Sequence, residues 1–226
     1  MSHHFEQPYF PPVYTARPDG LLMIGGRLTP PWLVAAYSRG IFPWPVVDDD
    51  REILAWFSPD PRAILRLDTL HVSRRLQRRM QSGEFQVSFN RDFAGVISAC
   101  AAPRDAHGGT WITPTLAAAY RELHELGHAH SVEVWHDEHL VGGVYGVALG
   151  GFFAGESMFH LRRDASKVAL VSLVERLQQR GFSLFDVQQP TSHLVSLGAI
   201  TIPRAAFLRR LKQALAHPVS FAATKE

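Results

Sequence analysis

The stretch LVGGVYGVALGGFFAGESMF, residues 140–159, holds two apolar runs on either side of Gly150-Gly151. Apolar runs of this length, rich in valine and phenylalanine, predict buried strands at residues 140–148 and 152–159. A glycine pair between two such runs predicts a hairpin turn. A third strand-like run, residues 130–135, precedes the dipeptide Asp137-Glu138. We therefore expect three consecutive antiparallel strands.

Helical patterns lie on both sides of these strands. A helix is expected from Thr113-Pro114 to Gly127, because threonine favours the N-cap, proline the first turn and glycine the C-terminal end. Downstream, Asp164 is expected to cap a helix over residues 166–179, and residues 184–187 to form a short buried strand. This order predicts an α+β fold with a mainly antiparallel sheet. Further predicted elements are helices at 72–80, 92–101 and 205–216 and a strand at 85–89.

The first 62 residues have a different character. Prolines recur from Pro8 to Pro61, and each removes a backbone donor and fixes φ, so long regular elements are not expected there. One helix is predicted over residues 32–38, after Thr29 as N-cap. We expect a small irregular N-terminal subdomain at residues 1–62 and an α/β core domain at residues 63–226.

Composition limits the class of protein. The chain has 226 residues, 46% of them hydrophobic and 19% charged, and a single cysteine, Cys100, so no internal disulfide can form. No signal peptide and no run of about 18 apolar residues is present, so a cytoplasmic protein is expected. The net charge is only +2, so any surface that binds nucleic acid must be a local patch.

A zinc-protease pattern, H-E-x-x-H, occurs at His124, Glu125 and His128. That chemistry needs both histidines on one helical face. The helix is expected to end at Gly127, so His128 would leave the face of His124. A zinc peptidase is therefore the weaker alternative, although a distant third ligand such as Glu156 stays open.

Five segments carry a resemblance to a known family. They are GLLMIGGRLTPPWLVAAYSRGIFPWP (20–45), WFSPDPR (56–62) with HVSRRLQRR (71–79), GTWITP (109–114) running on to residue 135, the stretch 140–159 with DASKVAL (164–170), and LFDVQQP (184–190) with HLVSLGA and IPR. In this order they resemble the leucyl/phenylalanyl-tRNA–protein transferases. The chain departs from the family pattern at Arg27, His160 and Val187.

The resemblance implies an enzyme that moves Leu or Phe, and also Met, from aminoacyl-tRNA to the N-terminal Arg or Lys of acceptor proteins. The reaction is aminolysis of an ester, and it marks the acceptor for N-degron proteolysis. The expected order of helix, three antiparallel strands, helix and strand resembles the core of the acetyl-CoA-dependent (GNAT) acetyltransferases. We further expect no cofactor, no bound metal, no membrane partner and a monomer.

Three polar residues are candidates for the catalytic site. Asp186 and Gln188 alternate at the end of a short predicted strand, so both can face one cleft. The resemblance implies that Gln188 meets the attacking amine and that Asp186 polarises or orients it. The proton can instead pass to water or to a ribose hydroxyl. Glu156 lies among apolar neighbours, where a carboxylate needs a partner, and it can pair with the incoming cation or with an internal one.

The acylating side chain needs an apolar and tolerant pocket. The motif match implies that five residues form its walls: Trp44, Trp111, Val144, Phe153 and Met158. The alternative is that they are ordinary core residues, which the sequence alone does not distinguish from pocket residues. Methionine suits such a pocket because its side chain adapts.

Basic residues repeat at helical spacing within residues 71–79. Arg74 and Arg78, like Arg75 and Arg79, are four apart, which concentrates charge on one face. Such a face predicts phosphate contacts with tRNA, and a solvated helix face is the alternative. Arg162, Arg163 and Lys167 can extend the patch.

Two other classes of protein are alternatives to the transferase. An acyl-CoA-dependent N-acetyltransferase would hold the CoA pyrophosphate with a glycine-containing loop at a helix N-terminus, but residues 159–167 contain no glycine. A non-catalytic tRNA-binding module is the other.

Overall fold

The computed structural model describes residues 7–48, 51–103 and 110–222. Their helices and strands are η1 (Val13–Thr15), β1 (Leu21–Ile24), α1 (Pro30–Tyr37), β2 (Phe42–Pro43), β3 (Val46–Asp48), β4 (Arg51–Ile53), β5 (Ala55–Phe57), β6 (Arg62–Leu65), η2 (Leu67–Thr69), α2 (Arg74–Gln81), β7 (Gln86–Phe89), α3 (Phe93–Ala101), α4 (Pro114–Glu125), β8 (Ala129–His136), β9 (His139–Leu149), β10 (Phe152–His160), α5 (Ala165–Gln179), β11 (Leu184–Gln188), α6 (Ser192–Ser196), β12 (Ala199–Ile202) and α7 (Arg204–Leu215).

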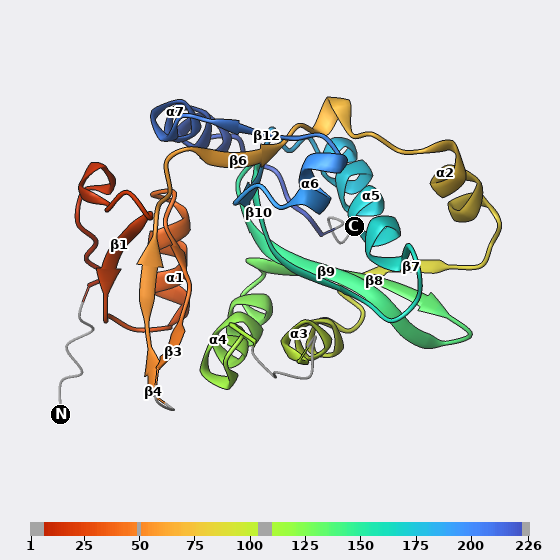
Figure 1. Ribbon diagram of the computed structural model, residues 1–226, viewed down its shortest axis with the longest axis horizontal. Coiled ribbons are helices and arrows are strands. Elements are labelled where there is room, and N and C mark those ends of the chain that lie inside the picture. Colours follow the sequence, from red (N-terminus) through yellow and green to blue (C-terminus); the bar gives the residue numbers. More distant parts are fainter. Residues whose placement is uncertain (1–6, 49–50, 104–109, 223–226) are drawn as a thin grey trace.

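A central sheet organises the part of the chain that the structure describes. Its strands lie in the order β12-β6-β11-β10-β9-β8-β7, and only the β10–β11 pair is parallel. The α+β class and the mainly antiparallel sheet predicted from the sequence are confirmed. In Figure 1, α3 and α4 cover one face of the sheet, while α5 and α6 lie on the other.

The two hairpins follow from their turn residues. Asp137 and Glu138 both have positive φ, 48° and 63°, as a tight two-residue hairpin turn requires. Gly150, with φ 53°, opens the next turn and approaches backbone carbonyls near the end of α7 so closely that a Cβ would collide with them. The three predicted strands are confirmed as β8, β9 and β10, each within about one residue of the expected bounds.

The N-terminal segment is more regular than its prolines suggest. Strands β1, β5 and β2 form a small sheet, β3 pairs antiparallel with β4, and α1 packs beside them (Figure 1). Its core is aromatic, with the Phe10 ring edge-on to Trp32 and Trp56 at 5.3 and 4.9 Å between centroids. Each of the strands β1 to β5 has four residues or fewer, too few to show an alternating pattern between the prolines, so the sequence did not predict them.

The last described residues complete the core on the α5 side of the sheet. The ring of Phe221 is buried, stacks on His130 at 4.5 Å and Phe153 at 5.6 Å, and packs edge-on to Phe182. Arg176 of α5 donates a hydrogen bond to the Phe221 carbonyl at 3.1 Å.

The parallel pair β10–β11 sets the position of the candidate site. The two strands pair only from Phe152↔Leu184 to Ala154↔Asp186, although β10 continues to His160. The β9–β10 register shifts between Gly155 and Ser157. Beyond Ala154 and Asp186, β10 and β11 no longer hydrogen-bond to each other, and side chains of both strands line a cavity.

Candidate active site

A cavity of about 380 Å³ opens where β10 and β11 separate. Its walls are mostly apolar and come from the N-terminal segment, β9, β10, α5, β11 and α6. The lining residues are Phe42, Pro43, Trp44, Trp111, Val144, Gly155, Glu156, Ser157, Met158, Leu170, Phe185, Val187, Gln188, Gln189, Thr191, His193 and Leu194. Glu156 is the one acidic residue among them.

Glu156 belongs to a hydrogen-bonded chain at the polar end of the cavity. Its Oε1 accepts a hydrogen bond from Gln188 Nε2 at 3.0 Å, and its Oε2 accepts one from the Tyr120 hydroxyl at 2.9 Å. Because the Tyr120 hydroxyl donates its hydrogen bond to Glu156, the Tyr37 hydroxyl acts as the donor to Tyr120. Burial raises the pKa values of both tyrosines well above their usual range, so they stay protonated donors at neutral pH.

The environment of Glu156 brings its titration to neutral pH. Burial raises the pKa of Glu156 to about 7, and the charge of Asp186 adds to the rise. The phenols of Tyr37 and Tyr120 and the charge of Arg62 oppose it. A carboxylate with a pKa near 7 is matched to proton transfer at physiological pH.

Asp186 occupies a different setting from Glu156. It is 0% exposed and does not line the cavity. Arg62 Nε and Nη2 donate to its two oxygens at 2.8 and 2.6 Å, which makes a bidentate ion pair. Its Oδ1 also accepts the backbone N–H of Gln188 at 3.0 Å.

The alternation expected for Asp186 and Gln188 is altered by local backbone geometry. Gln188 has φ +56°, and the β6–β11 register shifts between the two residues. Only the Gln188 side chain lines the cavity. The structure therefore brings Glu156 and Gln188 together at the cavity, with Asp186 behind them.

Four of the five predicted pocket residues line the cavity: Trp44, Trp111, Val144 and Met158. The rings of Trp44 and Trp111 lie 5.5 Å apart. Phe153 does not line this cavity. Phe153 lies where β10 still pairs with β11, and its ring packs in the core against Phe185 and Phe221.

The predicted basic helix is confirmed as α2, and its four arginines differ in their surroundings. Arg75 and Arg79 reach Asp164, at 3.4 and 3.2 Å, and Arg79 also pairs with Glu84 at 2.6 Å. Arg74 and Arg78 are exposed, and no ion pair of either is found among the described residues.

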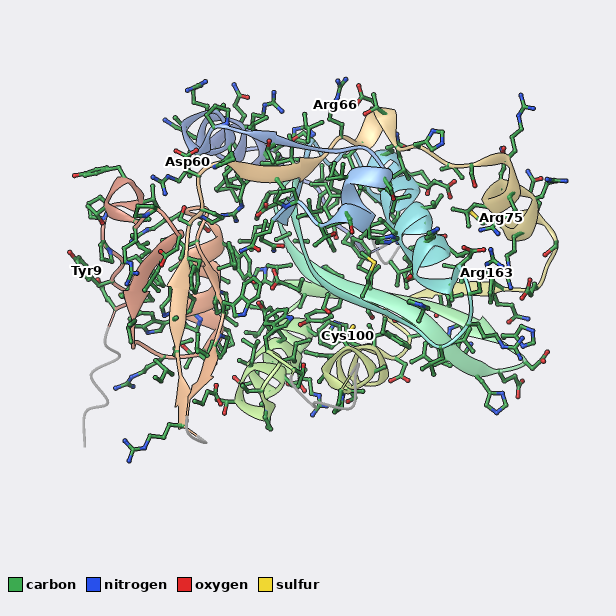
Figure 2. All side chains as sticks on the ribbon, viewed as in Figure 1. Tyr9, Asp60, Arg66, Arg75, Cys100 and Arg163 are labelled. Atoms are coloured by element: carbon green, nitrogen blue, oxygen red, sulfur yellow. The ribbon has the colours of Figure 1, made fainter. Side chains whose placement is uncertain are left out.

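Asp164 joins α2 to the start of α5. Its buried carboxylate also lies 3.7 Å from Lys167 and 4.0 Å from Arg163, and Figure 2 shows Arg75 and Arg163 on the same side of the molecule. Arg162 lies in the same turn, with its Nη1 3.0 Å from a ring nitrogen of His136. Asp164 takes the expected N-cap position of α5, but its φ is 68° and its side chain makes no capping hydrogen bond, because the carboxylate lies against these cations.

The residues of the zinc-protease pattern form the C-terminal end of α4 and its packing contacts. Helix α4 ends at Glu125, and Gly127 follows with φ 79°. The His124 ring stacks on Phe93 at 4.3 Å, and its Nδ1 lies 2.8 Å from the Ala129 carbonyl oxygen. Within residues 7–48, 51–103 and 110–222, no group of three or more His, Cys, Asp or Glu is placed to hold a metal.

Sequence reasoning missed several residues of the site. Arg62, Tyr37 and Tyr120 fix the polar groups, while Phe42, Leu170 and Leu194 complete the apolar wall. One signal was available, because a buried Asp186 requires a cationic partner. The other residues meet only through the tertiary fold.

Comparison with known proteins identifies the family. The family model described as leucyl/phenylalanyl-tRNA protein transferase matches residues 64–212, and the model of its N-terminal domain matches residues 26–60. A leucyl/phenylalanyl-tRNA–protein transferase of Aromatoleum aromaticum is 57% identical over 203 residues, covering 89% of this chain and 84% of that protein. One from Stutzerimonas stutzeri is 54% identical over 211 residues, covering 92% of each.

These matches define an enzyme of the aminoacyl-transferring class. The chain belongs to the leucyl/phenylalanyl-tRNA–protein transferase family. Among solved structures, a GCN5-related N-acetyltransferase from Kribbella flavida is similar with a TM-score of 0.41 and 11% identity, covering 74% of this chain and 58% of that one. Among the described residues, no helix is both long and apolar enough to cross a membrane.

Proposed function

We propose that this enzyme transfers Leu, Phe or Met from aminoacyl-tRNA to the N-terminal Arg or Lys of acceptor proteins. The observation that carries the proposal is the cavity, whose mostly apolar lining also includes Glu156 and Gln188, hydrogen-bonded to each other. An apolar side chain fits the walls, and an ammonium group fits the carboxylate and amide oxygens. The N-degron role, a cytoplasmic location, a monomeric state and the division into domains at residues 1–62 and 63–226 belong to the same proposal.

The chemistry needs positioning and one proton acceptor. The acceptor nitrogen attacks the ester carbonyl, a C–N bond forms, and the bond from the carbonyl carbon to the ribose oxygen breaks. The nitrogen loses a proton and the ribose oxygen gains one. Glu156, hydrogen-bonded to Gln188 at 3.0 Å, is suited to take the proton from the amine, and Gln188 to orient that amine.

The cations around Asp164 and on α2 are suited to hold tRNA phosphates. Arg74 and Arg78 carry the charge that the described acidic side chains leave unneutralised, while Arg75, Arg79, Arg163 and Lys167 share Asp164. Phosphate contacts provide affinity without reading sequence, so they suit an enzyme that accepts more than one tRNA.

The arginines of α2 give a prediction for tRNA binding. Replacing Arg74 and Arg78 together by alanine is expected to weaken binding of aminoacyl-tRNA, and the slope of log K against log salt concentration should shrink by about 0.9 for each lost phosphate contact. Filter binding across a salt series measures this. Replacement of Arg209 and Arg210 on α7 is the control, and equal slopes for all three proteins would contradict the assignment.

The cavity gives a prediction for donor selection. Val144→Phe reduces the volume available, so we expect transfer of Phe to fall by tens of fold, equivalent to about 1–3 kcal/mol, with a smaller loss for Leu. Transfer rates with both charged tRNAs, together with tRNA affinity and melting temperature as controls, measure this. Equal losses for Leu and Phe would count against a role for Val144 in the aminoacyl pocket.

The function itself is tested by following radiolabelled Leu or Phe from purified charged tRNA onto peptides that begin with Arg, Lys or Ala. Label on the Arg and Lys peptides alone supports the proposal. Absence of label on all three, with free amino acid and acetyl-CoA tested in parallel, would reject it.

The acyl-CoA alternative is not favoured by the start of α5. A helix N-terminus attracts a pyrophosphate through its free N–H groups. Here residues 159–167, which lead into α5, contain no glycine that would let the backbone approach such a pyrophosphate closely.

A further inference from the structure

Arg62 is 1% exposed, and its guanidinium group contacts three separate segments of the chain. It forms the bidentate pair with Asp186 on β11, and its Nη1 donates to the Gly40 carbonyl at 3.0 Å. Its guanidinium carbon lies 4.7 Å from the ring centroids of both Phe42 and Phe207, which belong to β2 and α7. Such a planar fork between two rings is a geometry that lysine does not reproduce.

The contacts of Arg62 fix two distant parts of the cavity. Through Asp186, whose Oδ1 accepts the Gln188 N–H, it supports the left-handed backbone of Gln188, a conformation that is uncommon for a residue other than glycine. Through its ring contact and the Gly40 carbonyl, it fixes Phe42, which lines the cavity wall.

We infer that Arg62 is a positioning residue for the transfer reaction, which holds the Gln188 amide and the Phe42 wall in fixed relation to each other. This inference rests on the proposed function. In this arrangement Asp186 acts on the Gln188 backbone and not on the substrate, because it is fully buried and both its oxygens bond to Arg62.

The first test is Arg62→Lys, which keeps the charge and loses the fork. We expect kcat to fall on the order of 10²-fold, because small displacements of a positioned group have effects of this size. The KM for aminoacyl-tRNA should stay within about twofold, since its phosphate contacts lie elsewhere. Arg66→Lys is the matched control. Arg66 directly follows β6, forms an exposed ion pair with Asp68 and lies at the surface in Figure 2.

A double-mutant cycle separates positioning from general damage. If Arg62 acts through Gln188, then Arg62→Lys should cost only about twofold in kcat once Gln188 is alanine. Additive losses in the cycle, or an unchanged kcat in Arg62→Lys, would overturn the inference. If wild-type protein transfers no label, the proposed function fails instead, so the two failures are distinguishable.

Chemical rescue covers the case in which the lysine variant does not fold. Arg62→Ala with millimolar methylguanidinium is expected to regain transfer activity, whereas tetramethylammonium at equal concentration should restore none. Recovery of the melting temperature by methylguanidinium without recovery of kcat would show a structural role only and would also overturn the inference.

Discussion

Glu156→Gln is expected to lower the transfer rate on the order of 10²- to 10⁴-fold, the range found for loss of a general base. The amide keeps the shape of the side chain and an oxygen that can accept the hydrogen bond from Gln188 or Tyr120, but it cannot take a proton from the attacking amine. Single-turnover transfer from charged tRNA to a peptide that begins with Arg measures the effect. Glu122→Gln, an exposed site on α4, is the matched control.

The pH dependence distinguishes a base from a binding group. Wild-type kcat/KM should rise with pH through the Glu156 pKa of about 7 and again through that of the acceptor amine, which lies near 8. In Glu156→Gln only the amine inflection should remain. A wild-type profile with the amine inflection alone would contradict the role of Glu156 as the base.

The same substitution has a consequence for stability with a defined sign. The folded-state pKa of Glu156 is raised above its usual value of 4.5, so the native protein binds this proton more tightly than the unfolded chain. Its contribution to stability is therefore lost as pH rises from about 4.5 to about 7, by at most about 3 kcal/mol. Glu156→Gln should escape that loss, so the inactive variant should be more stable than wild type at neutral pH.

Asp186→Ala is expected to lower the free energy of unfolding by about 3–5 kcal/mol, because it leaves the Arg62 charge buried without its partner. Urea denaturation followed by circular dichroism measures the loss. Asp68→Ala removes the partner of exposed Arg66 and should change the free energy of unfolding far less, because solvent screens this pair. A loss of similar size in both variants would show that the buried pair contributes no more than a surface pair.

This stability effect bears on how Asp186 variants are interpreted. Loss of transfer in Asp186→Ala mixes unfolding with displacement of Gln188, so it does not identify Asp186 as a group that touches substrate. Asp186→Asn keeps an acceptor for the Gln188 N–H and is the more informative variant.

The parts of the fold that sequence predicts are those fixed by neighbouring residues. The turns at Asp137-Glu138 and Gly150-Gly151, the apolar runs beside them and the cap of α4 at Thr113 are local features, and all are observed. Strands β6 and β12 were not predicted. Each has only four residues, too few to show a clear alternation, and they become strands by pairing with each other and, for β6, with β11.

The candidate site shows the same division. Glu156 and Gln188 lie together at the cavity because their strands are neighbours in the sheet. The core position of Phe153 and the different settings of Asp186 and Gln188 arise from where the β10–β11 pairing ends and from the register shift beside Gln188. Such irregularities depend on packing of the whole domain, so alternation along one strand does not reveal them.

The position of Phe221 determines when, during translation, the core can become complete. Its ring fills the space between His130, Phe153 and Phe182, so the core behind the candidate site lacks one of its members until translation has passed this residue. A nascent chain still short of it exposes those apolar surfaces to water on the ribosome. The sheet thus acquires its final packing late in biogenesis, after every residue of the cavity has already been made.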